Sequence, residues 1–273
     1  MPELPEVETV VRGLRQPLIG RTVRGMWYDW LRTVRMPDPE QFAARIHGQT
    51  FRAVERRAKY IICRLDHDLL VVHLKMTGRL YVVPDHETHD ADRWMHFRLQ
   101  LDAGQQLRFS DARKFGFVSL LSSFDELDPG LGPEPLEDDF TVDVLRQRLA
   151  GHRRAIKALL LDQAFLAGVG NIYADEALHL SGIHPLRPAD SLTDSEISLL
   201  HGAIRRVLHE GIEREGASVN WYRKPDGTTG DAQNHFRVYD RQGEPCLRCG
   251  TLIEKTRAAQ RGTHYCPVCQ RAP

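Results

Sequence analysis

The sequence predicts an α+β protein with two domains, in which a strand-rich half precedes a helical half. Short β-rich segments fill most of residues 22–121, helical apolar spacing begins after residue 141, and two pairs of cysteines stand near the end of the chain. The length of 273 residues suits one large or two ordinary domains, and 41% hydrophobic residues suffice for a packed core.

The chain opens on a predicted helix. Apolar side chains recur at helical spacing from Leu4 through Val7 and Val11 to Leu14, so we expect the helix to end near residues 14–16. Prolines and glutamates just before and inside the first turn are ordinary chemistry of a helix start, because proline fixes φ and acidic groups complement the helix dipole.

The same residues permit a chemical interpretation. Removal of Met1 would leave Pro2 as an N-terminal secondary amine. An α-amine has a pKa of about 8, against about 10.4 for lysine, so much of it is a neutral nucleophile near neutral pH. Amines attack carbonyl carbons to form Schiff bases, and Glu3 would stand beside this amine as a proton donor or acceptor.

Between residues 22 and 121 the pattern is that of short strands bounded by turn residues. The expected strands are residues 50–54, 60–65, 69–74, 80–83 and 97–101. We interpret this half as a β-sandwich or a barrel that is capped by the first helix.

A linker and helices follow. Residues 124–140 are acidic and contain prolines and glycines, which is the composition of a linker. Helices are expected at residues 142–149, 155–161, 173–180 and 197–212, and a polar loop at 216–234. The expected domains are therefore 1–123, a linker 124–140, a helical domain 141–235 and a separate cysteine-containing tail 236–273.

The charge is balanced overall but segregated along the chain. The formal net charge is zero, yet residues 237–271 and 52–59 are basic. Local basic patches can attract a polyanion even where the total charge cancels. No run approaches the ~20 apolar residues of a membrane span, and the acidic start lacks the pattern of a signal peptide. We expect a soluble, intracellular protein.

Four cysteines form the most specific local motif. Cys246 and Cys249 make one CxxC pair, and Cys266 and Cys269 make a second one 16 residues later. This spacing is typical of a zinc ribbon, in which four thiolates surround one structural Zn²⁺. Two disulfides are the alternative, which an intracellular location disfavours. Cys63 lies in an apolar strand and is expected to be a buried core residue.

Several motifs occur together in one order along the chain. They are residues 1–9 (MPELPEVET), 56–60 (RRAKY), 73–78 (HLKMTG), 111–116 (DARKFG), 168–176 (GVGNIYADE), 182–185 (GIHP) and the four cysteines. From residue 1 to 269 the sequence resembles bacterial formamidopyrimidine-DNA glycosylases, within the family that also contains endonuclease VIII. Each motif alone is weak, whereas their ordered combination is specific.

The resemblance implies a fold and an activity. It implies an N-terminal β-sandwich with the first helix, a helix–two-turn–helix segment and a C-terminal zinc-finger hairpin. The implied enzyme is a base-excision repair glycosylase and AP lyase. It flips and excises 8-oxoguanine opposite cytosine and formamidopyrimidines from double-stranded DNA, then cuts the strand by β- and δ-elimination. We expect a monomer in the bacterial cytoplasm, associated with the nucleoid during repair.

The resemblance also implies roles for particular residues. Catalysis would rest on Pro2 as the nucleophile, Glu3 as the proton donor, and Lys59 and Arg261 at the phosphates near the lesion. Further DNA contacts would come from His73, Arg113, Lys157, Asn171 and Tyr173. Met76, Arg113 and Phe115 would fill the base stack once the damaged base has been extruded, which costs a few kcal/mol.

Other interpretations stay open from the residues alone. Met76 and Phe115 could be core residues, and Lys59 a solvated strand lysine. An endonuclease VIII-type enzyme for oxidised pyrimidines would share Pro2, Glu3 and the finger, although its opening usually has glycine where Leu4 stands here. A non-catalytic zinc-ribbon protein would bind DNA without cleaving it. The loop around residues 216–222, which corresponds to the lesion-recognition loop of the family, is the part least similar to it.

Overall fold

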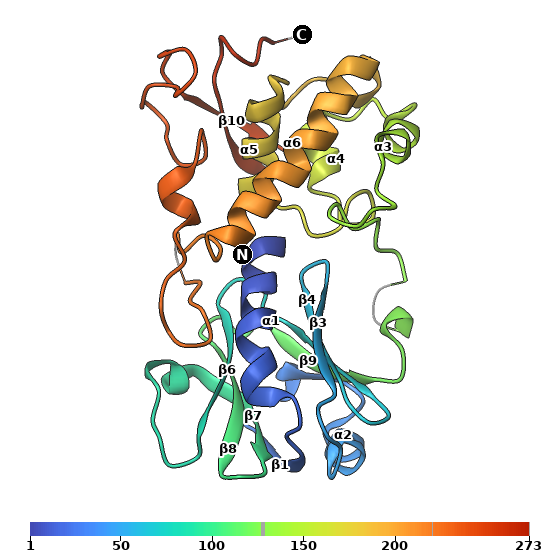
Figure 1. The fold of residues 1–273 in the computed structure, drawn as a ribbon, viewed down its shortest axis with the longest axis vertical. Coiled ribbons are helices and arrows are strands. Elements are labelled where there is room, and N and C mark those ends of the chain that lie inside the picture. Colours follow the sequence, from blue (N-terminus) through green and yellow to red (C-terminus); the bar gives the residue numbers. More distant parts are fainter. Residues whose placement is uncertain (127–128, 220, 273) are drawn as a thin grey trace. The chain divides into compact units, whose positions relative to one another are not determined.

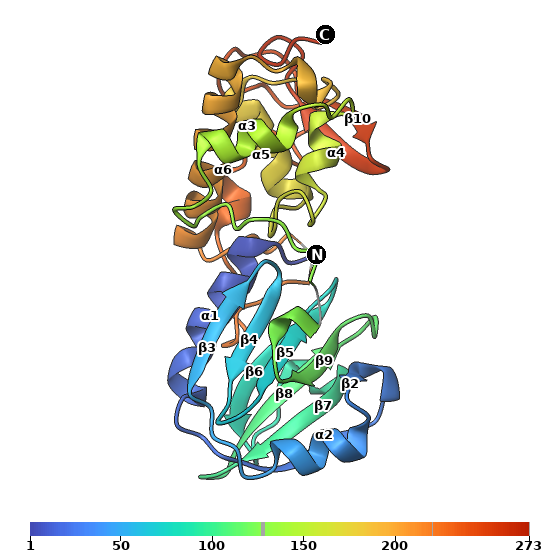
Figure 2. The same cartoon turned by 90° about the vertical axis from the view of Figure 1, so that its right-hand side faces the viewer.

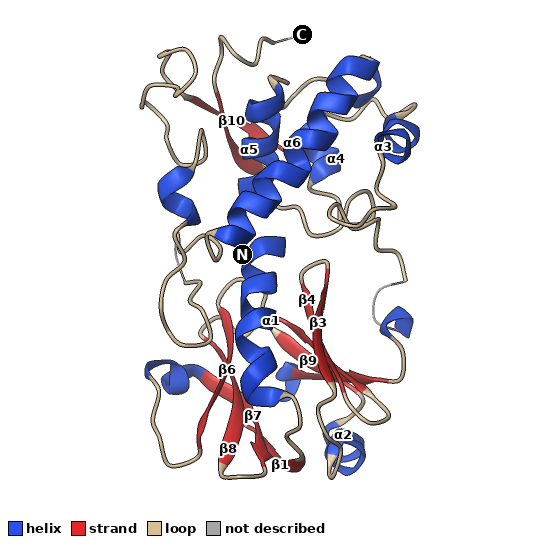
Figure 3. Ribbon diagram, in the orientation of Figure 1, coloured by secondary structure: helices blue, strands red, loops and turns tan. Residues whose placement is uncertain are grey.

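The chain forms two compact units in a computed structural model that describes residues 1–126, 129–219 and 221–272 (Figure 1). Unit 1 comprises residues 1–129 together with 214–231, and unit 2 comprises residues 130–213 together with 232–273. Strands dominate unit 1 and helices dominate unit 2 (Figure 3). The predicted α+β class, with a strand-rich half before a helical half, is confirmed.

Unit 1 is a β-sandwich with a helix along it. Its helices are α1 (Leu4–Leu18) and α2 (Pro39–Ile46), and its strands are β1 (Val23–Tyr28), β2 (Val34–Met36), β3 (Ala53–Arg57), β4 (Tyr60–Arg64), β5 (Leu69–His73), β6 (Gly78–Pro84), β7 (Met95–Leu101), β8 (Gln105–Asp111) and β9 (Phe117–Leu121). One sheet has the order β1-β7-β8-β6 and is antiparallel. The other has the order β2-β9-β5-β4-β3, in which only β2 and β9 run parallel.

The core of unit 1 lies between the two sheets and α1. Leu99 and Phe109 of the first sheet, Ile61 and Val72 of the second, and Leu14 of α1 are fully buried in one cluster. The helix packs on β3, β4 and β6, and it runs beside the sheets in both views (Figures 1 and 2). The open choice between a sandwich and a barrel is thereby decided in favour of two separate sheets.

The structure differs from the sequence analysis at two helices of unit 1. The first helix ends at Leu18, beyond the expected end near residues 14–16, and includes Pro17 in its last turn. Helix α2 was not expected at all. Asp38 begins it by accepting hydrogen bonds from the amides of Glu40 and Gln41, both at 3.1 Å, and Pro39 follows as the first helical residue. That Asp-Pro start was the missed signal.

Residues 214–231 pack with unit 1, although the sequence analysis assigned them to the helical domain. The ring of Tyr222 is buried in the core cluster of the sandwich, and its hydroxyl donates to the carbonyl oxygen of Glu215 at 3.2 Å. Burial raises the pKa of Tyr222 far above its usual range. No local sequence pattern predicts a contact between this tyrosine and strands more than a hundred residues away.

Unit 2 contains helices and one hairpin. Its elements are α3 (Val142–Leu149), α4 (Ile156–Leu160), α5 (Asn171–Ser181), α6 (Asp194–Glu213), β10 (Glu254–Ala258) and β11 (Arg261–Tyr265). Helix α5 is central, because it packs on α4, α6 and β11. All four helices begin and end within three residues of the expected ranges. No helix in the described ranges is both long and apolar enough to cross a membrane.

Two glycines of α6 provide a test of this packing. A Cβ atom on Gly211 would lie 2.6 Å from the ring and hydroxyl of the buried Tyr173, whereas one on Gly202 would meet nothing within 4 Å. We expect Gly211→Ala to destabilise the protein by about 1–3 kcal/mol, because the core must move. Gly202→Ala should instead stabilise it by about 0.5–1 kcal/mol through helix propensity. Urea unfolding of both variants measures the difference, and equal midpoints would contradict the close α5–α6 packing.

Candidate active site and metal centre

The N-terminal residues are buried at the start of α1. Pro2 is buried, and the side chain of Glu3 is only 3% exposed. The amide of Glu3 donates to Oε2 of Glu6 at 2.8 Å, and the amide of Val7 donates to the carbonyl oxygen of Glu3 at 3.0 Å. Met1 is 45% exposed and holds the nitrogen of Pro2 in a peptide bond. Removing Met1 would therefore free the nitrogen of a residue whose position is already fixed by the helix.

Lys59 and His73 lie on neighbouring strands. Lys59 is buried in the two-residue turn between β3 and β4, beside Ala58 with a φ of 52°, so the alternative of a solvated strand lysine is wrong. Tyr60, the first residue of β4, pairs with His73, and the two rings lie 4.7 Å apart. The sheet therefore brings Lys59 close to His73.

His73 is held neutral. Burial, together with the charges of Lys75, Lys59 and Arg35, lowers the pKa of His73 from 6.5 to about 3. Its Nδ1 accepts a hydrogen bond from the amide of Lys75 at 3.0 Å. Because Nδ1 is an acceptor in a neutral ring, Nε2 carries the proton and can donate to an anionic oxygen.

Met76, Arg113 and Phe115, which we call the wedge, lie at the tips of two turns. Met76 follows β5, whereas Arg113 and Phe115 lie in the turn between β8 and β9. The ring of Phe115 is 54% exposed, and the guanidinium of Arg113 lies 4.8 Å from its centroid. Core packing, the alternative interpretation of Phe115, is excluded by this exposure.

The wedge borders a basic, apolar hollow. Met76 and Phe115 are among the residues that line an open depression of about 740 Å³. Its cationic lining residues are Arg32, Arg35, Lys75 and Lys114, and no acidic side chain of the described residues lines it. The guanidinium of Arg35 lies 4.5 Å from the ring centroid of Phe117. A surface of this kind can bind phosphate and present apolar side chains to bases.

Lys157 is buried inside unit 2 rather than at its surface. Its side chain is 0% exposed and forms an ion pair of 2.6 Å with Asp175, which is also 0% exposed. The ammonium also donates to Oγ1 of Thr263 at 2.7 Å and to the carbonyl oxygen of Gly262 at 3.2 Å. In this structure Lys157 therefore fastens the hairpin β10–β11 to helices α4 and α5, a position that differs from the expected phosphate contact.

The remaining candidates of unit 2 divide into buried and exposed residues. Asn171 begins α5, and its Nδ2 donates to the carbonyl oxygen of Gly262 at 3.0 Å. Tyr173 is 2% exposed and packs against Gly211, so it also lies inside the unit. Arg261 is exposed at the start of β11, directly after the turn of the hairpin. Asn171 thus contacts the hairpin to which Arg261 belongs.

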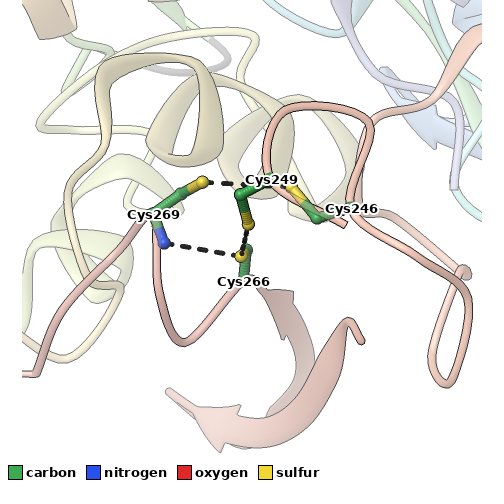
Figure 4. Close-up of side chains that lie close together, drawn as sticks. All are labelled: Cys246, Cys249, Cys266 and Cys269. Atoms are coloured by element: carbon green, nitrogen blue, oxygen red, sulfur yellow. Dashed lines mark hydrogen bonds between the residues drawn. The ribbon is translucent and has the colours of Figure 1, made fainter. Parts of the chain in front are cut away.

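The four cysteines of the two CxxC pairs converge (Figure 4). Their sulfur atoms all lie within 4.8 Å of one another. Sγ of Cys249 lies 3.5 Å from that of Cys266, and Sγ of Cys246 lies 4.0 Å from that of Cys269. Zinc–sulfur bonds of about 2.3 Å in a tetrahedron place sulfurs about 3.8 Å apart, so this group fits one zinc ion. The distances are far too long for disulfides.

The surroundings of the cysteines support the same conclusion. The amide of Arg248 donates to Sγ of Cys246 at 3.4 Å, and the amide of Cys269 donates to Sγ of Cys266 at 3.4 Å. Gly250 has a φ of 77°, the left-handed conformation that closes the first knuckle. Four protein ligands leave no open coordination position, so the zinc is structural. The fifth cysteine, Cys63, is buried in β4 as expected, and burial raises its pKa to about 12.

Three acidic residues without an expected role bind the backbone or side chains of other residues. Asp175 pairs with Lys157 and accepts the amide of His264 at 2.9 Å. Glu176 accepts the amides of residues 237–239 at 2.8–3.0 Å, where the tail begins. Asp111 accepts hydrogen bonds from backbone amides of the turn that carries Arg113. Asp175 and Glu176 are adjacent and have apolar neighbours on both sides in the middle of α5, which was the available signal for the first two.

Zinc binding can be measured directly. We expect one zinc ion per chain, lost on Cys249→Ser, because a module this small does not fold without its metal. Metal analysis by inductively coupled plasma mass spectrometry checks the stoichiometry. Cys63→Ala is the matched control, since Cys63 lies in unit 1, and it should retain the zinc. Retention of a full equivalent by Cys249→Ser would contradict the four-cysteine site.

The neutral state of His73 predicts a dependence of stability on pH. The unfolded chain takes up the proton near pH 6.5, whereas folded His73 does so only near 3. The part of the free energy of unfolding that depends on His73 is therefore fully present above about pH 6.5. It is lost as the pH is lowered toward about 3, by up to ~1.4 kcal/mol per pH unit. Urea unfolding at about pH 7 and about pH 4.5 measures the loss. In His73→Asn it should be smaller; an unchanged loss would show that His73 is not the responsible group.

Family models match the chain in three consecutive stretches. Residues 1–118 match the formamidopyrimidine-DNA glycosylase N-terminal domain, and residues 131–223 match the H2TH domain of the same enzyme. Residues 243–272 match the zinc finger found in FPG and IleRS. The last match agrees with the four-cysteine zinc site, and together the three cover most of the chain.

Individual proteins match over the full length. Formamidopyrimidine-DNA glycosylase from Symbiobacterium thermophilum is 50% identical, covering 100% of this chain and 90% of the relative, and that from Chloroflexus aurantiacus is 51% identical, covering 99% and 98%. Among solved structures, Lactococcus lactis Fpg with abasic-site DNA has a TM-score of 0.91 at 37% identity, and MutM with DNA containing carbocyclic 8-oxo-G has 0.90 at 37%. Both cover 99% of this chain and 100% of their own. The chain belongs to the formamidopyrimidine-DNA glycosylase family.

Proposed function

We propose that this protein excises oxidised purines from double-stranded DNA and then cleaves the strand at the abasic site, with the nitrogen of Pro2 as the nucleophile. The observation that carries this proposal is the buried Pro2-Glu3 start of α1 in a chain that matches the family from end to end. Fpg from Lactococcus lactis was solved with abasic-site DNA, and MutM with DNA containing carbocyclic 8-oxo-G. The 8-oxo-G ligand supports an oxidised purine as the substrate here, and the abasic-site ligand supports cleavage at an abasic site.

The proposed chemistry begins once Met1 has been removed. The lone pair on the nitrogen of Pro2 attacks C1′ of the damaged nucleotide, and the bond from C1′ to the base breaks, so that the base leaves with the bonding electrons and takes up a proton. The attacking nitrogen loses its proton, and protonation of the sugar ring oxygen then breaks the bond from C1′ to that oxygen, which leaves an iminium between C1′ and Pro2. Because the amine is secondary, the resulting iminium is permanently cationic and withdraws electrons from C2′. Loss of the C2′ proton then expels the 3′ phosphate, and a second elimination expels the 5′ phosphate.

Glu3 is the proposed proton donor to the sugar. Its carboxyl group lies one residue after Pro2 and is 3% exposed, so it can deliver a proton to the ring oxygen as C1′ is attacked. Lys59 and His73 are the proposed phosphate contacts of unit 1. The turn position of Lys59 and the Nε2 proton of neutral His73 support these roles.

The wedge is proposed to fill the space left by the extruded base. An exposed Phe115 beside Met76 at a basic hollow supports insertion into a base stack. Arg113 would donate to the cytosine that loses its partner. In unit 2, Asn171 and Arg261 are the proposed phosphate contacts, whereas burial of Lys157 and Tyr173 supports a structural contribution in place of direct binding.

The proposed division of labour follows the chain. The chemistry belongs to residues 1–123, and DNA is also held by the domain 141–235 and the zinc finger 236–273, with 124–140 as the linker. Within the domain 141–235, residues 214–231 pack with unit 1. We infer that the protein acts as a monomer. The relatives named above are bacterial, which supports a location in the bacterial cytoplasm at the nucleoid.

Borohydride trapping tests the nucleophile. Protein with Pro2 at its N-terminus should cleave a duplex with 8-oxoguanine opposite cytosine and form a covalent adduct in borohydride, identified at Pro2 by mass spectrometry. Pro2→Gly should reduce trapping greatly. Glu3→Gln should slow base excision by about 100-fold or more, because proton transfer by a positioned acid contributes at least that much.

A blocked N-terminus and a panel of duplexes serve as controls. Protein with an N-terminal extension before Pro2 should form no adduct, and undiminished trapping would overturn the role of Pro2. Faster scission of a duplex with an oxidised pyrimidine would indicate an endonuclease VIII-type preference. DNA binding without scission of any lesion would point to a non-catalytic protein.

A further inference from the structure

Asp111 is a buried carboxylate at the end of β8, immediately before the turn that carries Arg113 and Phe115. Its side chain is 1% exposed. Oδ1 accepts the hydroxyl of Thr77 and the amide of Arg113, the latter at 3.1 Å. Oδ2 accepts the amides of Phe115 at 2.8 Å and Gly116 at 2.6 Å. No lysine or arginine of the described residues forms an ion pair with it, so N–H and O–H donors alone stabilise the charge.

Thr77 connects this carboxylate to the other wedge turn. It follows Met76 directly, its side chain is buried, and its hydroxyl donates to Asp111. Its Oγ1 also accepts the amide of Arg113 at 3.1 Å. The amide of Arg113 is therefore shared between Thr77 and Asp111. The hydroxyl of Thr77 on one turn and the backbone amides of the other turn are thus joined through this hydrogen-bonded group.

Strand pairing places the two turns at the same sheet end. Strand β6 begins at Gly78, directly after the turn that carries Met76, and β8 ends at Asp111. Gly78 and Asp111 are partners in the antiparallel register. The turns therefore leave neighbouring strands at one level, and the Thr77–Asp111 hydrogen bond joins them there.

Both turns are tight and contain a residue in the left-handed conformation. Lys75 has a φ of 50° and Lys114 a φ of 57°, which is unfavourable for a residue with a side chain. A Cβ atom on Gly78 would lie 2.4 Å from the carbonyl oxygen of Leu74, and one on Gly116 would lie 2.5 Å from the ring of Phe109. Such backbones persist only where surrounding contacts hold them. Asp111 accepts three backbone amides of the turn between β8 and β9, and it accepts the hydroxyl of Thr77 next to the other turn.

We propose that Asp111 and Thr77 are positioning residues that hold the wedge in its inserting conformation. This inference rests on the proposed function, because it concerns how the base is extruded. Inserting Phe115 into a base stack pushes against the turn that carries it. A turn that is already ordered loses no conformational freedom at that step, so the support accelerates extrusion. Neither residue needs to contact DNA, and neither takes part in bond breaking.

The test compares Thr77→Val, which keeps the shape of the side chain but lacks the hydroxyl, with Thr77→Ser, which keeps the hydroxyl. Extrusion is followed by stopped-flow fluorescence of 2-aminopurine placed next to 8-oxoguanine in a duplex. Cleavage of a single-stranded oligonucleotide with an abasic site is the reference reaction, because no base has to be extruded from it.

Thr77→Val should slow extrusion by about tenfold, as expected for losing a hydrogen bond to a buried charge, while Thr77→Ser stays within about twofold of the parent protein. Both should cleave the single-stranded abasic substrate at the parent rate. Asp111→Asn should slow extrusion further, because an amide offers one acceptor oxygen where the carboxylate offers two.

Distinct results would overturn the proposal. Equal extrusion rates for Thr77→Val and Thr77→Ser would show that the hydroxyl contributes nothing. An equal slowing of extrusion and single-strand cleavage would show a general structural role. If Asp111→Asn does not fold, the Thr77 pair decides alone. Failure of the parent protein to cleave the abasic oligonucleotide would instead refute the proposed function, which separates the two inferences.

Discussion

The carboxylate of Glu6 connects the start of the chain to a segment 211 residues away. Its Oε2 accepts the amide of Glu3 and its Oε1 accepts the amide of Ala217, both at 2.8 Å, and the side chain is 1% exposed. Chain termini are poorly ordered unless they are tied down, and a buried carboxylate must be hydrogen-bonded. The two hydrogen bonds of Glu6 therefore hold the chain terminus in place and also satisfy the buried carboxylate, and the position of Pro2 depends on them.

The hydrogen bond between Ala217 and Glu6 joins the segment 214–231 to α1. Gly216 has a φ of 78°, and a Cβ atom there would lie 3.0 Å from Cγ of Glu6, so only glycine permits the approach. Tyr222 then enters the core of the sandwich. Although this segment follows the last helix of unit 2 in sequence, its packing belongs with the residues proposed to carry the chemistry.

Unit 2 uses buried charge to hold its zinc-binding tail. The Lys157–Asp175 pair is fully buried, and Glu176 binds the backbone where the tail begins. Removing one partner of such a pair leaves an uncompensated charge, so these contacts specify one docking position for the hairpin rather than add much stability. Arg261 lies at the exposed end of that hairpin, so these contacts also fix the position of its backbone within unit 2.

Features that depend on residues close together in the chain could be predicted before the fold was known. The zinc site follows from two local knuckles, the first helix from apolar spacing, and the family from motifs in a fixed order. Three features could be seen only in the folded protein. Lys157 is buried against Thr263, 106 residues away, Thr77 donates to Asp111 across 34 residues, and residues 214–231 pack with the sandwich. Spacing and propensity describe contacts within a few residues, whereas these partners meet only after strands pair and helices pack.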